Sequence, residues 1–183
     1  MQIHYPGTAN GQTDQTKVNI KYTVEPLREI HIDAFIHQAN LDQGEINIPP
    51  NEVATYTGDY QLPFQQDITL LDINAHMHLL AQEVQSYALL PNNDTVKFME
   101  VLEWDFHWQG FYDFKQPIRI PGGTRFEGRV VYDNTTNNPD NPNSPPQTVT
   151  VGDETTDEMF LIFFSWVDYE PGDEDIVVDG SIG

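Results

Sequence analysis

The stretch Asp72–Leu80, with the sequence DINAHMHLL, decides how the rest of the chain is interpreted. It directly follows the apolar run Ile68–Leu71, so residues 68–80 together are predicted to form a β-strand. Side chains on a strand alternate between its two faces, and His76 and His78 are therefore expected to point the same way. Two imidazoles side by side on a strand make half of a metal site.

A third ligand is expected from a distant part of the chain. Met159 stands in residues 156–164 (TDEMFLIFF), where a polar stretch gives way to an apolar one that opens another predicted strand. Two imidazole nitrogens and a thioether form a soft, low-charge set that suits Cu(I) better than zinc, calcium or magnesium. The ordinary alternatives are a chance His-x-His pair and a methionine that only fills the core. Burying two imidazoles without partners is costly, which favours a shared ligand.

Chain length, net charge and cysteine content limit which kinds of protein and which binding partners are compatible with the sequence. The chain has 183 residues, enough for one domain with a core, and a formal net charge of −21 from 8 basic and 29 acidic residues. This charge disfavours nucleic acid and anionic membranes as partners. No apolar run is long enough to span a membrane, and there is no cysteine to form a disulfide.

Short segments of strand character, separated by turn signals, run along the chain. They predict an all-β fold, an antiparallel β-sandwich of jelly-roll type over residues 1–169, followed by an acidic, solvent-bound tail at 170–183. Residues 79–90 could form a helix, but a strand is favoured, with a hairpin turn at Asn92–Asp94. The predicted strands cover residues 2–5, 17–24, 30–36, 52–60, 68–80, 85–90, 96–104, 125–132 and 159–167, while the prolines that follow residues 46–48 exclude a central strand there.

Two loops have competing interpretations. The aromatic segment Phe106–Phe114 is most simply a loop that caps the core, and the Pro- and Asn-rich segment 133–147 a loop in solvent. Calcium binding around Asp133 and Asp140 is the alternative for the second loop, but the regular ligand spacing of a calcium loop is missing. The remaining histidines, His31, His37 and His107, are expected to be solvated or satisfied within the core.

Several of these motifs resemble one family. His76-Met77-His78 after an apolar strand, Ile120–Thr124 (IPGGT) and Thr156–Met159 (TDEM) are similar to the C-terminal domain of copper type II ascorbate-dependent monooxygenases, such as peptidylglycine α-hydroxylating and dopamine β-monooxygenases, and the Asn/Pro loop is similar to bacterial members. The resemblance implies that His76, His78 and Met159 hold an oxygen-activating copper, with O₂ and a small-molecule substrate as partners.

The resemblance extends to the N-terminus. Gln2–Tyr5 resembles the family's Gln-x-His-Tyr, which implies that His4 is the third ligand of a second, electron-transferring copper. The other ligands of that copper would belong to an N-terminal domain missing from this chain, so we expect the chain to be part of a longer protein. We also expect an extracellular or periplasmic location, with the export signal outside this sequence.

Two positions depart from the family's peptide-amidating members. Those members have an arginine where this chain has Asn74, and a tyrosine where it has Phe163. A carboxylate-ended peptide would lose charge-assisted contacts there, so peptide amidation is not expected. The sequence thus predicts a domain of a copper-dependent hydroxylase. In isolation, without the N-terminal domain, this domain is expected to have little or no turnover. The alternatives are a non-catalytic copper-binding or assembly domain, and a carbohydrate- or protein-binding jelly roll that uses Trp104, Trp108, Phe111 and Tyr112.

Overall fold

The computed structural model describes residue 11 and residues 13–24 and 27–178. Within these residues the regular structure is almost entirely β, with two short 3₁₀ helices, η1 (Gln38–Asn40) and η2 (Asp173–Asp175). The strands are β1 (His31–His37), β2 (Asn47–Ile48), β3 (Val53–Gln61), β4 (Ile68–His76), β5 (Ala81–Leu89), β6 (Thr95–Val101), β7 (Tyr112–Ile120), β8 (Arg125–Asp133), β9 (Val149–Thr150) and β10 (Leu161–Asp168). In the described part of the chain, no helix is long and apolar enough to cross a membrane.

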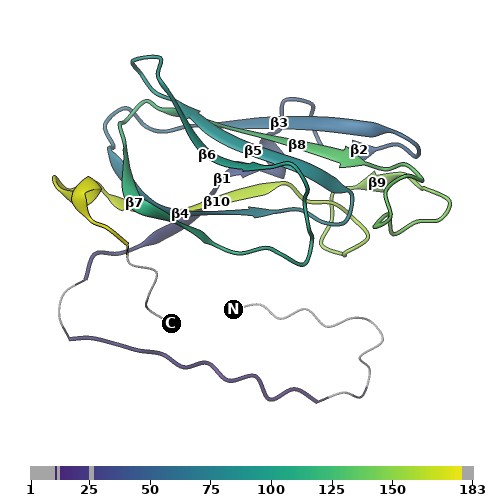
Figure 1. The fold of residues 1–183 in the computed structure, drawn as a ribbon, viewed down its shortest axis with the longest axis horizontal. Helices are drawn as coiled ribbons and strands as arrows, with labels where there is room; N and C mark the ends of the chain where they lie inside the picture. The colour runs from purple at the N-terminus through teal and green to yellow at the C-terminus, as the bar shows by residue number, and fades with distance from the viewer. Residues whose placement is uncertain (1–10, 12, 25–26, 179–183) are drawn as a thin grey trace.

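Eight of the strands form two antiparallel four-stranded sheets that lie one above the other (Figure 1). One sheet has the strand order β1-β10-β4-β7 and the other β3-β8-β5-β6, while β2 and β9 pair separately. The prediction of an all-β, antiparallel fold is confirmed, and the two facing sheets are consistent with the predicted sandwich. Its assignment to the jelly-roll type stays a prediction.

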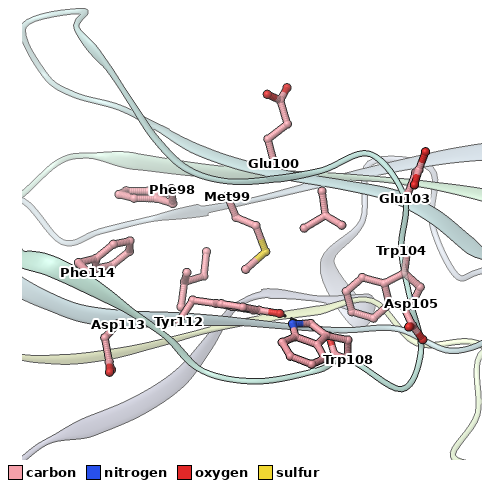
Figure 2. Close-up of a pocket in the computed structure, with 12 residues that line it drawn as sticks. Phe98, Met99, Glu100, Glu103, Trp104, Asp105, Trp108, Tyr112, Asp113 and Phe114 are labelled. Carbon is pink, nitrogen blue, oxygen red and sulfur yellow. Dashed lines mark hydrogen bonds between the residues drawn. The ribbon is translucent and has the colours of Figure 1, made fainter. Parts of the chain in front are cut away.

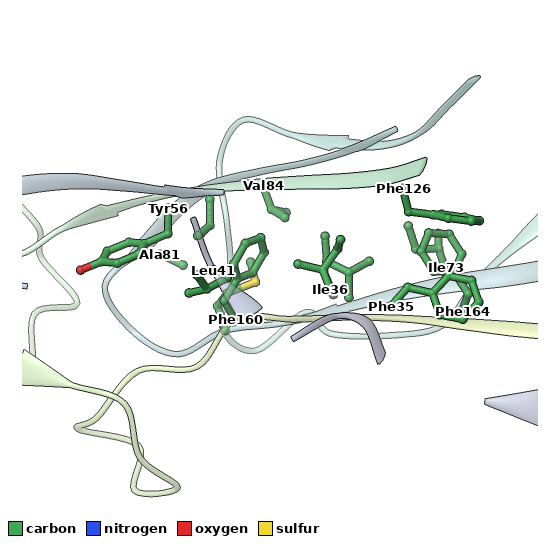
Figure 3. Close-up of a cluster of buried hydrophobic side chains, with 14 of the residues drawn as sticks. Phe35, Ile36, Leu41, Tyr56, Ile73, Ala81, Val84, Phe126, Phe160 and Phe164 are labelled. Carbon is green, nitrogen blue, oxygen red and sulfur yellow. The ribbon is translucent and has the colours of Figure 1, made fainter. Parts of the chain in front are cut away.

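Period-two burial explains why these segments become strands. In β8 every second residue, Phe126, Gly128, Val130 and Tyr132, is buried, and the residues between them are more exposed. Phe126 contacts Phe164 of the opposite sheet at 5.2 Å between ring centroids. Buried side chains from both sheets fill the space between them (Figure 3). The core therefore fixes the two sheets as one rigid support for the loops at their ends.

Several predicted strands have the right position. Residues 79–90, which could have been a helix, contain β5, and β5 pairs with β6 through a hairpin at Asn92–Asp94. Asn93 has φ of 69°, in the left-handed region that asparagine tolerates well.

Other predictions are wrong. Residues 17–24 form no strand despite their alternating pattern, and Val18, Ile20 and Tyr22 are exposed. Strand β7 is absent from the predicted set; it lies at the edge of its sheet, where Pro117 is tolerated because the missing N–H can face solvent. The aromatic segment 106–114 does not simply cap the core, because Trp108 is 74% exposed and the segment runs into β7.

The acidic stretch after Tyr169 is more firmly held than predicted. Asp173 is buried, accepts hydrogen bonds from the Arg28 guanidinium and the Thr69 hydroxyl, and begins η2. The division of the chain at residue 170 stays a prediction, and the predicted strand at residues 2–5 lies outside the described residues.

Candidate metal centre

A cavity of about 870 Å³ lies beside the end of β4 and the start of β10. Three of the residues predicted as metal ligands, His76, His78 and Met159, line it together. The fourth, His4, lies outside the described residues. The other residues that line the cavity are mainly apolar or aromatic: Ile32, Asn74, Phe106, Gln109, Phe111, Asp153, Thr155, Leu161 and Phe163.

The two histidines do not both lie on the strand as predicted. Strand β4 ends at His76, and His78 follows in the extended residues before the turn at Leu79. Their rings nevertheless remain neighbours, with centroids 5.2 Å apart and planes at 82°. The alternation of side chains along a strand therefore does not explain why the two rings are close, and other contacts must hold them.

His76 is oriented by a glutamine from the loop before β7. The Gln109 side-chain amide donates to the backbone oxygens of Phe106 (2.7 Å) and Met77 (3.3 Å), which fixes its Oε1 as the acceptor facing His76. The Nδ1 of His76 lies 2.6 Å from this Oε1 and must be the donor. The neutral tautomer set in this way carries its free lone pair on Nε2.

His78 has the same tautomer as His76, but here a backbone carbonyl oxygen accepts the hydrogen bond from Nδ1. Its Nδ1 donates to the carbonyl oxygen of Asp157 at 3.0 Å, so its Nε2 is likewise left with a lone pair. The residue is 4% exposed, and burial lowers the pKa of its imidazole, with the neighbouring His76 adding to this effect. His78 is therefore neutral at neutral pH, as a metal ligand must be.

Glu158 ties the histidine segment to the methionine segment. Its fully buried carboxylate accepts the backbone N–H groups of His78 (2.9 Å), Leu80 (2.7 Å) and Met159 (3.2 Å). Burial raises the pKa of Glu158 to about 7, against the three N–H groups that lower it. One side chain thus sets the backbone positions of two predicted ligands.

Met159 is held from its other side as well. The hydroxyl of Tyr132, inside the core on β8, donates to the Met159 carbonyl oxygen at 2.7 Å. In the part of the chain that the structure describes, no group of three or more His, Cys, Asp or Glu side chains is placed to hold a metal ion. A three-ligand site at this cavity would therefore need the thioether of Met159 beside the two imidazoles. The soft, neutral set that results fits copper in its reduced state.

The remaining histidines take no part in this cavity. His31 stacks on Trp166, and His37 accepts the backbone N–H of Ala39 at its Nδ1. His107 lies against Asp105 at the surface.

The positioning residues Gln109 and Glu158 were not identified from the sequence. Gln109 carries no pattern of its own, whereas Glu158 offers one signal, an acidic residue immediately before an apolar strand. The two positions where the chain departs from peptide-amidating enzymes, Asn74 and Phe163, both line the cavity. Asn74 donates its amide to the Gly110 carbonyl oxygen at 2.9 Å.

The chain was compared with known protein families and with curated proteins. The family described as copper type II ascorbate-dependent monooxygenase, C-terminal domain, matches residues 38–173, which include all three cavity residues predicted as ligands. No curated protein matches the chain.

Proposed function

The chain belongs to the copper type II ascorbate-dependent monooxygenases as a C-terminal domain of that family, and from this we propose that it binds copper at His76, His78 and Met159 for the hydroxylation of a C–H bond. The observation that carries the proposal is the state of the two imidazoles. Both Nδ1 atoms are engaged by acceptors, and both rings line one cavity with a thioether. Acceptors at Nδ1 are the usual means of orienting histidine ligands.

A bound copper ion would supply the oxygen activation and electron transfer that hydroxylation needs. The chain's own contribution is geometric. Gln109 and the Asp157 carbonyl hold the rings, and Glu158 holds the backbone that carries His78 and Met159. Apart from the three predicted ligands, five apolar or aromatic and four polar residues line the cavity, and the apolar part of this wall favours a substrate with an apolar portion.

The cavity argues against a substrate with a carboxylate end. No lysine or arginine lines it among the described residues, and Asp153 contributes a negative charge. Asn74 stands where peptide-amidating members have arginine, and its amide is already engaged by Gly110. We therefore propose a small substrate without a carboxylate that binds in this cavity beside the three predicted ligands.

The family implies a two-domain enzyme that acts on a substrate and O₂. We propose that this chain is one part of such an enzyme, that His4 contributes to a second copper site shared with an N-terminal domain, and that the protein is extracellular or periplasmic. The chain alone would then bind copper with little or no turnover, because the second electron has no internal source.

The test is a copper titration with matched variants. Cu(I) is titrated in competition with a chromophoric chelator, and wild type is compared with His76→Ala, His78→Ala and Met159→Leu. We expect one copper ion per chain, about a tenfold or greater loss of affinity for each ligand variant, and no loss for His107→Ala at the surface. X-ray absorption of the Cu(I) form should detect a sulfur ligand that Met159→Leu removes.

Two outcomes would count against the proposal. Copper binding unchanged in His76→Ala would exclude this site. Tight copper at this site, with no product when the N-terminal domain, ascorbate and O₂ are all supplied, would favour the alternative of a non-catalytic copper-binding domain.

A further inference from the structure

A second cavity, of about 580 Å³, opens between the free edges of the two sheets (Figure 2). Strand β6 is the edge of one sheet and β7 the edge of the other, so this side of the sandwich has no closing strand. The loop between these two strands, residues 102–111, passes across the opening. The cavity is separate from the metal cavity, because the two have no lining residue in common.

Five aromatic rings and a thioether form the wall of this cavity. Met99 projects into the middle of it, with the Trp108 and Tyr112 rings close by in Figure 2. Trp108 is 74% exposed and Tyr112 is 40% exposed, so neither side chain is fully packed against the rest of the protein. The aromatic residues are Phe98, Trp104, Trp108, Tyr112 and Phe114.

The charged residues that line the cavity are all acidic. Its lining includes four acidic residues and no lysine or arginine, and the whole chain carries a formal net charge of −21. The carboxylates of Glu100 and Asp113 point away from the aromatic interior in Figure 2 and lie on its rim. The four acidic residues are Glu100, Glu103, Asp105 and Asp113.

We propose that this cavity binds a small organic cation with an alkylammonium or quaternary ammonium head. Aromatic faces attract such heads through their π electrons, and the effect is strongest for tryptophan. The acidic rim raises the local concentration of cations and disfavours anions. A neutral apolar ligand would gain from the rings but not from the rim, and an inorganic cation would gain from the rim but cannot use the apolar wall.

Three ligands that share a bulky three-methyl head and differ mainly in charge test this proposal. Choline is the cation, 3,3-dimethylbutan-1-ol its neutral counterpart, and 3,3-dimethylbutanoate the anion. Binding to the copper-free chain is followed by the indole N–H signals of the three tryptophans in NMR titrations. Trp166, whose Nε1 donates to Asp33 outside the cavity, serves as the internal control.

We expect choline to shift the Trp104 and Trp108 signals, to leave Trp166 unchanged, and to bind about tenfold tighter than the alcohol. The carboxylate should not bind measurably. Trp108→Leu keeps apolar bulk but removes the ring face, so it should abolish the preference for choline over the alcohol. Leu102→Ala, in the same loop but exposed and outside the cavity lining, should leave choline binding unchanged.

Other results would overturn the proposal. Equal affinity for choline and the alcohol would show an apolar site without selectivity for cations. Equal shifts at all three tryptophans would show general attraction to an acidic surface. Retained preference for choline in Trp108→Leu, with a folded spectrum, would place the binding elsewhere.

Discussion

The carboxylate of Glu158 accepts the backbone N–H of His78 at 2.9 Å, and 80 residues of sequence separate these two partners. This contact links the residues after β4 to the segment before β10. Because Glu158 also accepts from Leu80 and from its own neighbour Met159, it fixes the relative position of a proposed nitrogen ligand and the proposed sulfur ligand.

Replacing Glu158 with glutamine should therefore weaken both the fold and the copper site. A glutamine amide turns a donor toward backbone N–H groups, which leaves at least one of them unsatisfied. We expect the free energy of unfolding to fall by about 1–3 kcal/mol and copper affinity to fall about tenfold. Urea unfolding and chelator competition measure the two effects, with exposed Glu52→Gln as the control. Wild-type stability in the variant would contradict this role.

Gln109 should affect copper binding without much effect on stability. Its Oε1 accepts from the His76 ring at 2.6 Å, so Gln109→Leu frees that ring to rotate and to change tautomer. We expect a loss of copper affinity of about 10- to 100-fold, while the denaturation midpoint changes little. Gln85→Leu on the exposed side of β5, where the amide contacts Glu100, is the matched control. An unchanged affinity would mean that the His76 ring needs no such support.

Asp173 should make stability depend on acid pH. The Arg28 guanidinium, followed by the Thr69 hydroxyl, holds the pKa of Asp173 well below its usual range. Because the folded pKa is lower than the unfolded value of about 3.9, the stabilisation is complete above that value and is lost as pH falls below it. Asp173→Asn should cost about 2 kcal/mol at pH 7 and progressively less toward pH 2, measured by urea unfolding. If the loss of unfolding free energy in Asp173→Asn were the same at every pH, the ion pair with Arg28 would not be its cause.

Replacing Gly122 with any residue that has a Cβ atom should destabilise the fold. A Cβ at this position would lie 2.4 Å from the backbone oxygen of Phe64, and a backbone group cannot swing aside. Gly122→Ala should destabilise the fold by about 1–3 kcal/mol in thermal or urea unfolding. Gly110→Ala, where a Cβ would meet no atom within 4 Å, is expected to change little and controls for the loss of glycine flexibility. Equal effects of the two variants would show that the close contact at Gly122 is not the cause.

The fold could be predicted wherever side chains face a core on one side only. β8 shows this, since Phe126, Val130 and Tyr132 are buried and alternate with polar or half-buried residues, and the alternation in the sequence alone predicts the strand. The same pattern fails at residues 17–24, because alternation describes a strand but does not supply a partner for it. β7 is absent from the predicted strands, and the structure shows it as an edge strand, which tolerates Pro117.

The candidate site could be predicted only as a set of ligands. His76, His78 and Met159 were identified by residue type and position, and the structure brings them to one cavity. The groups that orient them could not be found in this way. Gln109 acts from 33 residues after His76, and Glu158 from 80 residues after His78, so each depends on pairings between distant segments.

Anyone who transplants this centre into another β-sandwich would need more than two imidazoles and a thioether at matching coordinates. The buried carboxylate at Glu158 makes the donor segments inseparable, since the backbone amides of one are anchored by the other. A recipient scaffold would need a buried site in which backbone N–H groups of both segments can donate to that carboxylate. Only then could the three ligand side chains be introduced in the same arrangement. The unit to transfer is therefore the two segments that carry His78 and Met159, together with the Glu158 carboxylate that joins them.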